Sequence, residues 1–597
     1  MRSVALAAIV AGTAATASAV PAYRGVVKVT QPDGTEISVR QTGDERCHFK
    51  FTEDGYLLET DSEGRLVYAS ILSDGSIRPS SIMARDKAQR SASDLKFLGG
   101  ISAEMTRMAI DARMEKASSP FRITRAEVPT HYLNRGLCNS TFKQNKGEVK
   151  GIVILVEYSD VKMDSENAYK GYSDYQAGAD AYTYFNDFLN KEGFDGFGSS
   201  GSVRDWFLLN SRDAEGDSQF SPTFDVFGPV TLPQKRSYYG GNDAWGSDKN
   251  PQKMVTDALD ILLADTNSNL NLADYDNDGD GEVDNIYIIY AGQGEADSSV
   301  ADSVWPHSWT VGSGKDYNGV TVYHYGCNSE TNWKKMPDGI ATFIHEFSHV
   351  IGLPDLYNTT NSYATYTPGM YSVLDYGPYN NDGLTPPNYS AYERYALDWL
   401  KPLEVPYEAD IELPNLADSN VAYMVRTERT DNTGLGTASV NEYFLFENRQ
   451  LTGWDAYIPG HGMLIWHIDY SKTHFEGNTV NNASSHCYVD LVEANGIAQA
   501  SAKSPYPGTG NYTTCTFKSW AGKDCGVTLS DITEDTSAGI VKMHAVNING
   551  DSGVEGIESD SNGEAEYFNL QGLRVSRPEA GQLLIRLQNG KASKILF

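Results

Sequence analysis

The sequence predicts an α+β domain in the middle of the chain, between two β-rich regions. Three observations lead to this prediction. Residues 149–160, VKGIVILVEYSD, form a continuous apolar run typical of a buried strand. Residues 338–352, DGIATFIHEFSHVIG, place apolar side chains at helical spacing. The flanking segments, from residue 20 to about 80 and from about 407 to 546, alternate apolar and polar residues between turns, as antiparallel strands do.

Length and charge limit the possible functions. A chain of 597 residues is long enough for several domains. Its 79 acidic and 48 basic side chains give a net charge of -31, which argues against nucleic acid as a partner. We expect a monomer.

The first residues are typical of an export signal. One Arg, a short apolar run and the small residues Ala17-Ser18-Ala19 predict a signal peptide that is cut after Ala19. No later stretch reaches the ~20 apolar residues that a membrane-spanning helix needs. The sequence therefore predicts a protein without a transmembrane helix, secreted to the medium or the outer cell surface.

Two histidines stand four residues apart on the predicted helix. His345 and His349 therefore lie one turn apart, and both imidazoles can reach one metal ion. Glu346 is one step round the helix, where its carboxylate can hydrogen-bond a water on that ion without ligating it. Gly352 and Pro354 end the helix. This pattern predicts a catalytic zinc site with a general base beside it.

A third ligand is expected just after the helix. Gly352 permits a backbone reversal that can bring Asp355 back to the ion and leave a fourth position for water. An Asp after Pro is also a common turn residue, so Glu393 and Glu447 stay open as alternatives. A site with Glu393 would change the ligand geometry and leave the reaction the same.

A second metal signal lies at residues 274–284, DYDNDGDGEVD. Asp276, Asp278 and Asp280 alternate before Gly281, and Asp284 closes the group. Short loops wrap calcium with alternating oxygens around a Gly turn, although no bidentate Glu follows here at the full EF-hand distance. We expect a structural calcium ion; a solvated acidic turn is the alternative.

Residues 345–357, HEFSHVIGLPDLY, resemble the zinc motif of the immune inhibitor A family of secreted bacterial metalloproteases, which are related to the metzincins. Other segments are similar to that family's pattern: ILVEYSDV (154–161), GSVRDWFLLNS (201–211), DYDNDGDGEVDNIYIIYAG (274–292), VWPHSW (304–309), NDGLTPPNYSAYERYALDWL (381–400) and ENRQLTGWDAYIPGHGMLIWHID (447–469). The resemblance covers roughly residues 145–545. It implies a zincin-like catalytic domain and a zinc endopeptidase that is made as a zymogen and acts on proteins or peptides.

One position departs from that pattern. Metzincin-like enzymes place a Met beneath the zinc and a Tyr two residues later, whereas MYSVLDYG (370–377) has Leu374 and keeps Tyr376. Leu fills much the same apolar volume as Met. Tyr376 is then a candidate phenol for stabilising the oxyanion of the reaction, with an ordinary packing role as the alternative.

The tail from Tyr567 to Phe597 is similar to C-terminal sorting segments of Bacteroidetes type IX secretion substrates, which implies a secretion machinery as partner. An ordinary β-hairpin cap is the alternative. The expected organisation is a signal peptide (1–19), a β-rich prodomain with a helical connector (20–145), the zincin-like catalytic domain (146–406), a β-rich, sandwich-like domain (407–546), a linker (547–566) and the C-terminal segment (567–597).

Six cysteines are too few for a disulfide-built scaffold. Cys515 and Cys525 are the expected pair. Cys47 in the prodomain raises a second possibility, a thiolate that occupies the zinc in the latent enzyme, although pairing with Cys138 or no role is expected first.

These observations together predict a secreted zinc endopeptidase in which Glu346 takes a proton from the attacking water. A surface-binding or adhesive protein is the competing interpretation, with a metal site that no longer cuts, as Leu374 would suggest. The intact Glu346 favours catalysis, because a binding domain needs no base beside the ion.

Overall fold

The computed structural model of the protein describes residues 19–72, 75–117, 145–164, 168–172, 180–243, 246–284, 286–360, 364–427, 442–549, 566–569, 574–575, 583–588 and 591–596. The predicted signal peptide up to Ser18, most of the predicted linker and Cys138 lie outside the described residues.

The N-terminal region forms one antiparallel sheet of six strands in chain order. Its strands are β1 (Val26–Thr30), β2 (Glu36–Gly43), β3 (His48–Thr52), β4 (Leu57–Thr60), β5 (Leu66–Ile71) and β6 (Ile77–Met83). Ile37, Val39 and Tyr68 are buried in its core. The 3-10 turn η1 (Lys87–Gln89) and helices α1 (Ala92–Leu98) and α2 (Ala103–Ala117) follow.

A mixed five-stranded sheet forms the centre of the molecule, in the order β10-β11-β9-β7-β8. Its strands are β7 (Gly147–Glu157), β8 (Phe220–Thr231), β9 (Ile286–Gln293), β10 (His307–Tyr317) and β11 (Val320–Thr331). All neighbours are parallel except β10, which pairs antiparallel with β11. The apolar run around residue 152 forms β7, as predicted, in the interior of this sheet.

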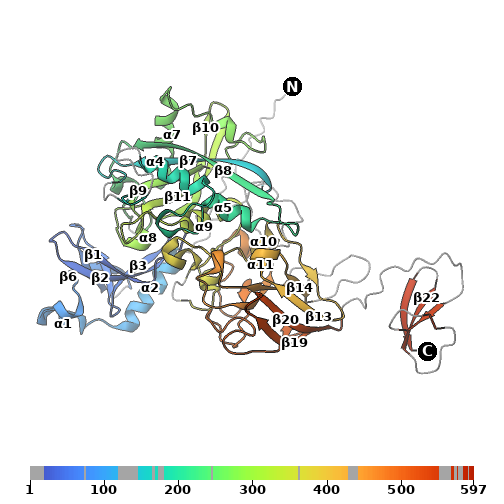
Figure 1. Ribbon diagram of the computed structural model, residues 1–597. Helices are drawn as coiled ribbons and strands as arrows, with labels where there is room; N and C mark the ends of the chain where they lie inside the picture. The colour runs from blue at the N-terminus through green and yellow to red at the C-terminus, as the bar shows by residue number, and fades with distance from the viewer. Residues whose placement is uncertain are drawn as a thin grey trace, which may run out of the picture.

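Helices cover both faces of the central sheet because β7 is apolar on both faces. Val153 and Leu155 belong to a core shared with α4 (Asp180–Asn190), α5 (Val203–Asn210) and α9 (Ile340–Val350). Ile152 and Ile154 belong to a second core, which α7 (Pro251–Ala264) covers. Figure 1 shows α7 above the strands and α9 below them. Short elements connect these: η2 (Gly196–Gly198), α6 (Arg236–Tyr239), η3 (Leu272–Tyr275), α8 (Glu295–Ser298), η4 (Gly369–Tyr371), η5 (Gly377–Gly383) and α10 (Ala391–Ala396).

The helix that carries the two histidines is fixed by its aromatic residues. The ring of Phe343 lies 4.0 Å from that of Tyr287 on β9, and the ring of Phe347 lies 5.3 Å from that of Phe207 on α5. The predicted apolar stripe from Ile340 to Ile351 is buried throughout. Burial of such side chains contributes about 1.5–3 kcal/mol each, so the orientation of α9 is strongly determined.

Two further sheets lie C-terminal to the central sheet, and they pack around one core that includes Phe444, Ile465 and Leu529. The first has the order β12-β14-β15-β16-β17 and the second β13-β20-β19-β18. Their elements are β12 (Leu403–Glu404), β13 (Glu408–Pro414), α11 (Leu416–Ser419), β14 (Tyr423–Arg426), β15 (Glu442–Arg449), η6 (Gly453–Asp455), β16 (Gly462–Asp469), α12 (Lys472–Glu476), β17 (Val489–Leu491), β18 (Cys515–Lys518), β19 (Asp524–Asp535) and β20 (Ile540–Asn547).

The expected disulfide between Cys515 and Cys525 is wrong, because both thiols are free and buried. The strand register explains this: Cys515 on β18 lies opposite Leu529 on β19, four residues beyond Cys525. The two cysteines therefore stand at different levels of the hairpin.

The mixed α/β architecture with several sheets agrees with the predicted fold class. Within the described residues, no helix is long and apolar enough to cross a membrane. A last sheet of β21 (Glu566–Phe568), β22 (Leu583–Gln588) and β23 (Lys591–Leu596) lies apart from the rest of the protein in Figure 1.

Candidate metal centre and active site

Three side chains converge at the end of α9. The Nε2 atoms of His345 and His349 are 3.2 Å apart, and Asp355 Oδ1 lies 3.3 Å from the first and 3.2 Å from the second. In a tetrahedral zinc site with ligand distances of about 2.0–2.1 Å, the ligand atoms stand roughly 3.3 Å from one another. The donor set and its spacing therefore fit a zinc ion with a fourth position open.

Each imidazole is held with Nε2 facing the centre of this triangle. Nδ1 of His345 lies 2.7 Å from the carbonyl oxygen of Val373, and Nδ1 of His349 lies 2.8 Å from that of Leu353. Each Nδ1–H donates to its carbonyl, which leaves the Nε2 lone pair for a metal. Burial lowers the pKa of His345, which favours the neutral imidazole that a metal requires.

The loop after α9 brings Asp355 back to the histidines. Gly352 has a φ of +106°, a conformation that favours glycine, and Leu353 N–H donates to Ser348 O (3.0 Å). Asn478 then holds Asp355 from a distant part of the chain: Asp355 N–H donates to its Oδ1 (2.8 Å), and its Nδ2 donates to Asp355 Oδ2 (2.5 Å). Burial acts to raise the pKa of Asp355, but the two imidazoles outweigh it and lower that pKa below its ordinary value.

Glu346 is fully buried beside the triangle. Its carboxylate also approaches the two histidines, and ligand atoms of His345, Glu346 and His349 lie within 4.8 Å of one another. Asp355 is nevertheless the better third ligand, because it is equidistant from both Nε2 atoms while Glu346 Oε1 accepts a hydrogen bond from Val20 N–H (2.9 Å). Burial, with the charges of Asp355 and Glu45 adding to it, raises the pKa of Glu346.

The alternative ligands of the sequence analysis are engaged elsewhere. Glu393 accepts hydrogen bonds from Ser372 Oγ (2.6 Å) and Ser390 N (2.5 Å) in the capping box of α10. Glu447 accepts from Trp466 Nε1 (3.0 Å) and pairs with Arg449. Both carboxylates therefore stabilise the fold around α10 and β15.

The N-terminal segment from Ala19 to Tyr23 contacts Glu346 and Tyr357, beside the metal triangle. Ala19, Val20 and Ala22 are at most 3% exposed. Three aromatic side chains donate to the backbone of this segment: Tyr357 Oη to Ala19 O (2.6 Å), Trp305 Nε1 to Val20 O (3.0 Å) and Tyr379 Oη to Pro21 O (2.6 Å). The segment thus lies along the site as a peptide bound mainly through its main chain.

Comparison with known proteins agrees with this geometry. Residues 139–402 match the catalytic domain of the immune inhibitor A peptidase family M6. This part of the chain is similar to the immune inhibitor A peptidases. Immune inhibitor A of Bacillus thuringiensis subsp. alesti is 27% identical over 323 residues, which are 47% of this chain and 44% of that protein. Pre-pro-metalloprotease PrtV of Vibrio cholerae serotype O1 (strain M66-2) is 25% identical over 276 residues, 42% of this chain and 29% of that protein. The matches therefore span less than half of these relatives, and the family resemblance predicted from the sequence is confirmed.

The segment around Leu374 contacts the candidate metal site through main-chain hydrogen bonds. This side chain is fully buried, and its carbonyl oxygen accepts a hydrogen bond from Leu356 N–H (2.8 Å). The carbonyl oxygen of the neighbouring Val373 holds His345, so this segment is tied both to a proposed metal ligand and to the loop that carries Asp355. Tyr376 contacts the residue that follows the N-terminal segment: the guanidinium carbon of Arg24 lies 3.7 Å from its ring centroid.

The acidic loop before β9 gathers three of its four predicted calcium ligands. Carboxylate oxygens of Asp276, Asp278 and Asp284 lie within 4.8 Å of one another. Asp280 is outside this group, and its Oδ1 accepts from Glu282 N–H (2.9 Å). Burial raises the pKa of Asp284 to about 6, with the charges of Asp278 and Asp280 adding to the effect. The three oxygens fit a hard cation, which would relieve this repulsion.

Calcium is expected to stabilise the domain around the central sheet, since Asn277 ties the acidic loop to β7 by two hydrogen bonds with Lys150. A ligand present at 100 times its Kd adds about 2.7 kcal/mol to the free energy of unfolding. Differential scanning calorimetry of the zinc-loaded protein, with calcium against EGTA, should show a rise of several degrees. The Asp278→Asn variant should lose most of this rise and Asp274→Asn, outside the cluster, should keep it; equal rises would contradict the site.

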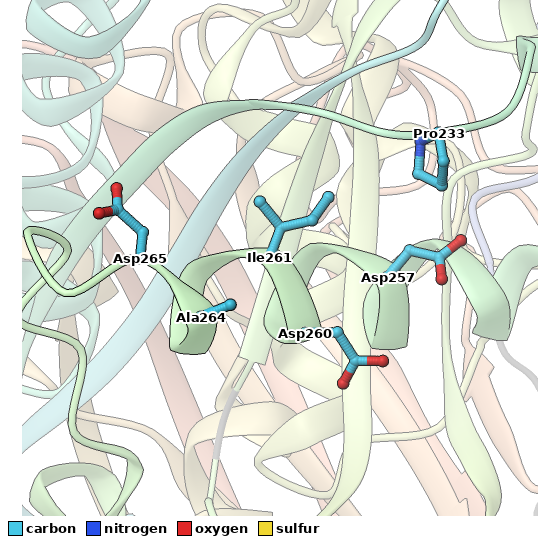
Figure 2. A pocket seen from close by; sticks show the side chains of 6 residues that line it. All are labelled: Pro233, Asp257, Asp260, Ile261, Ala264 and Asp265. Carbon is cyan, nitrogen blue, oxygen red and sulfur yellow. The ribbon is translucent and has the colours of Figure 1, made fainter.

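A separate hollow lies along α7 (Figure 2), lined by Pro233, Asp257, Asp260, Ile261, Ala264 and Asp265. Its carboxylates have partners: Asp257 accepts from Tyr239 Oη (2.8 Å) and Asp260 from Lys315 Nζ (2.7 Å). The metal-site residues do not line it, and it is not part of the candidate active site.

Sequence reasoning missed Asn478, Tyr357 and the role of Val20. Asn478 is 123 residues from Asp355, and an Asn in a turn carries no signal of such a contact. Among the described residues, the cluster around His345 contains no cysteine. Cys47 is buried instead with Phe49 and Ile110, and burial raises the pKa of its thiol to about 12.

Proposed function

We propose that this protein is a secreted zinc endopeptidase that hydrolyses peptide bonds in proteins. The triangle of His345, His349 and Asp355 with Glu346 beside it carries the proposal. The M6 catalytic-domain match and the metalloprotease name of the Vibrio cholerae relative support it. When bound by these three side chains, zinc would supply a Lewis acid that activates a water and polarises the scissile carbonyl.

Glu346 acts as the general base in this proposal. It takes a proton from the attacking water and then passes it to the nitrogen of the leaving amine. The position of its carboxylate supports both steps, because Oε1 lies 2.9 Å from the main-chain nitrogen of Val20, where the nitrogen of a bound peptide lies. The two imidazoles keep their Nδ1 protons on main-chain carbonyls and take no part in proton transfer.

The same contacts support synthesis as a zymogen. The segment from Ala19 to Tyr23 fills the cleft, so a substrate cannot enter while it is bound. If the chain is cut after Ala19, the new amino group of Val20 lies beside Glu346. The N-terminal sheet docks on the peptidase domain through Glu295, which pairs with Lys50 (2.9 Å) and His48 (3.2 Å). Burial acts to raise the pKa of Glu295, but Lys50 and His48 outweigh it and lower the pKa to about 2.

Cleavage of casein tests the proposed function. The full chain should be latent, and the form processed by limited trypsin digestion in the Lys- and Arg-containing connector should cut casein. A chelator such as 1,10-phenanthroline should abolish the activity, and added zinc should restore it. A folded, processed, zinc-loaded protein that leaves casein intact would overturn the proposal in favour of a metal-containing binding protein.

A further inference from the structure

One peptide bond in the cleft is held at both of its polar atoms. Val20 N–H donates to Glu346 Oε1 (2.9 Å), and Tyr357 Oη donates to the carbonyl oxygen of Ala19 (2.6 Å). These two groups belong to the same peptide unit. The Ala19–Val20 bond therefore lies between the proposed base, at its nitrogen, and a phenol, at its oxygen.

These two hydrogen bonds are at the atoms where peptide hydrolysis needs a proton donor and a stabilising group. The base must deliver a proton to the amide nitrogen, and negative charge develops on the carbonyl oxygen. Both atoms of the Ala19–Val20 unit that would change in the reaction already have a partner. Trp305 and Tyr379 hold the next two carbonyl groups, so the segment is fixed at three successive residues.

The fold fixes the position of the Tyr357 phenol. Tyr357 is 3% exposed and follows Asp355 by two residues, on the loop that Leu356 N–H ties to Leu374 O (2.8 Å). The loop that delivers the proposed third metal ligand thus also delivers this hydroxyl. The ring of Tyr376, in contrast, contacts Arg24, four residues after Val20 in the chain.

We propose that Tyr357 is a catalytic residue whose hydroxyl donates a hydrogen bond to the scissile carbonyl oxygen and stabilises the charge that develops there. This inference rests on the proposed peptidase function. Water oxygen attacks the carbonyl carbon and Glu346 accepts the proton; the C–N bond then breaks and that proton goes to the amine. Tyr357 forms no covalent bond and keeps its proton throughout, as an ordinary phenol does at neutral pH.

The Tyr357→Phe variant of the processed, zinc-loaded protein tests this role. Tyr239→Phe is the matched control, because Tyr239 is also fully buried and its hydroxyl donates to Asp257 (2.8 Å), outside the candidate active site. Steady-state cleavage of a fluorogenic peptide should show kcat about 10²- to 10³-fold lower in Tyr357→Phe, as for loss of one oxyanion donor, with KM nearly unchanged. Tyr239→Phe should stay within a few-fold of the wild type. Zinc content, measured by atomic absorption, should be equal in all three proteins.

A second measurement does not depend on turnover. A phosphinic peptide, whose tetrahedral phosphorus mimics the transition state, should bind Tyr357→Phe more weakly by calorimetry, in parallel with the loss in kcat/KM. Equal affinities, a kcat within threefold of the wild type, or a loss that accompanies loss of zinc would each overturn the inference. An inactive wild type would refute the proposed function itself, while the phosphinic peptide would still report on the hydroxyl.

Discussion

Replacing Glu346 by glutamine is expected to lower kcat for peptide cleavage by about 10²- to 10⁴-fold, the range that general acid–base catalysis contributes. Glutamine has the same shape and keeps an oxygen that can accept the Val20 N–H, but it cannot take a proton from water. The processed variant should therefore fold and bind zinc like the wild type. Hydrolysis of a fluorogenic peptide, measured together with zinc content, checks this.

A control variant for this experiment is Asp382→Asn. Asp382 lines the same small cavity as Val20, its side chain is 45% exposed, and its φ of +55° is one that Asn also adopts. We expect it to retain nearly full activity. If Glu346→Gln cleaves as fast as Asp382→Asn, the activity comes from a contaminant or from a different active site.

Replacing Asp355 by alanine is expected to remove stable zinc binding and with it all peptidase activity. Two imidazoles alone leave the ion with too few protein ligands, because catalytic zinc sites use three. Asn478→Ala should weaken zinc affinity by about 10- to 100-fold, since partners of metal ligands commonly have effects of this size. Competition for zinc with a chromogenic chelator measures the zinc affinity of both variants.

Asn482→Ala is the matched control for Asn478→Ala. Asn482 belongs to the same loop and accepts from Thr359 N–H (2.8 Å), but it does not touch the carboxylate of Asp355. The zinc affinity of the Asn482→Ala variant should stay near that of the wild type. Unchanged zinc affinity in Asp355→Ala would show that another residue completes the site.

The parts of the site that could be predicted from the sequence are local. His345, Glu346 and His349 lie within one helical turn, and the stripe of apolar residues fixes which way that turn faces. Gly352 marks the reversal that brings Asp355 close, because its backbone conformation is one that other residues rarely adopt.

The other parts depend on contacts between distant segments. Tyr357 lies inside the recognised stretch, yet its spacing alone does not reveal that its hydroxyl meets the Ala19 carbonyl, 338 residues away. The disulfide prediction failed for a related reason. Two cysteines that flank a turn predict a disulfide. The strand register decides whether they face each other, however, and here Cys515 lies opposite Leu529.

The loop after α12 has a consequence for dissecting the protein. Asn478, Asn481 and Asn482 hold Asp355, Leu356 and Thr359 through a set of side-chain to main-chain hydrogen bonds. This loop lies well beyond residue 402, where the family match ends. A fragment cut at that boundary would keep both histidines and lose the clasp on the third ligand. We therefore expect the smallest fragment that keeps the proposed metal site intact to include the first C-terminal sheet, which supports the metal loop.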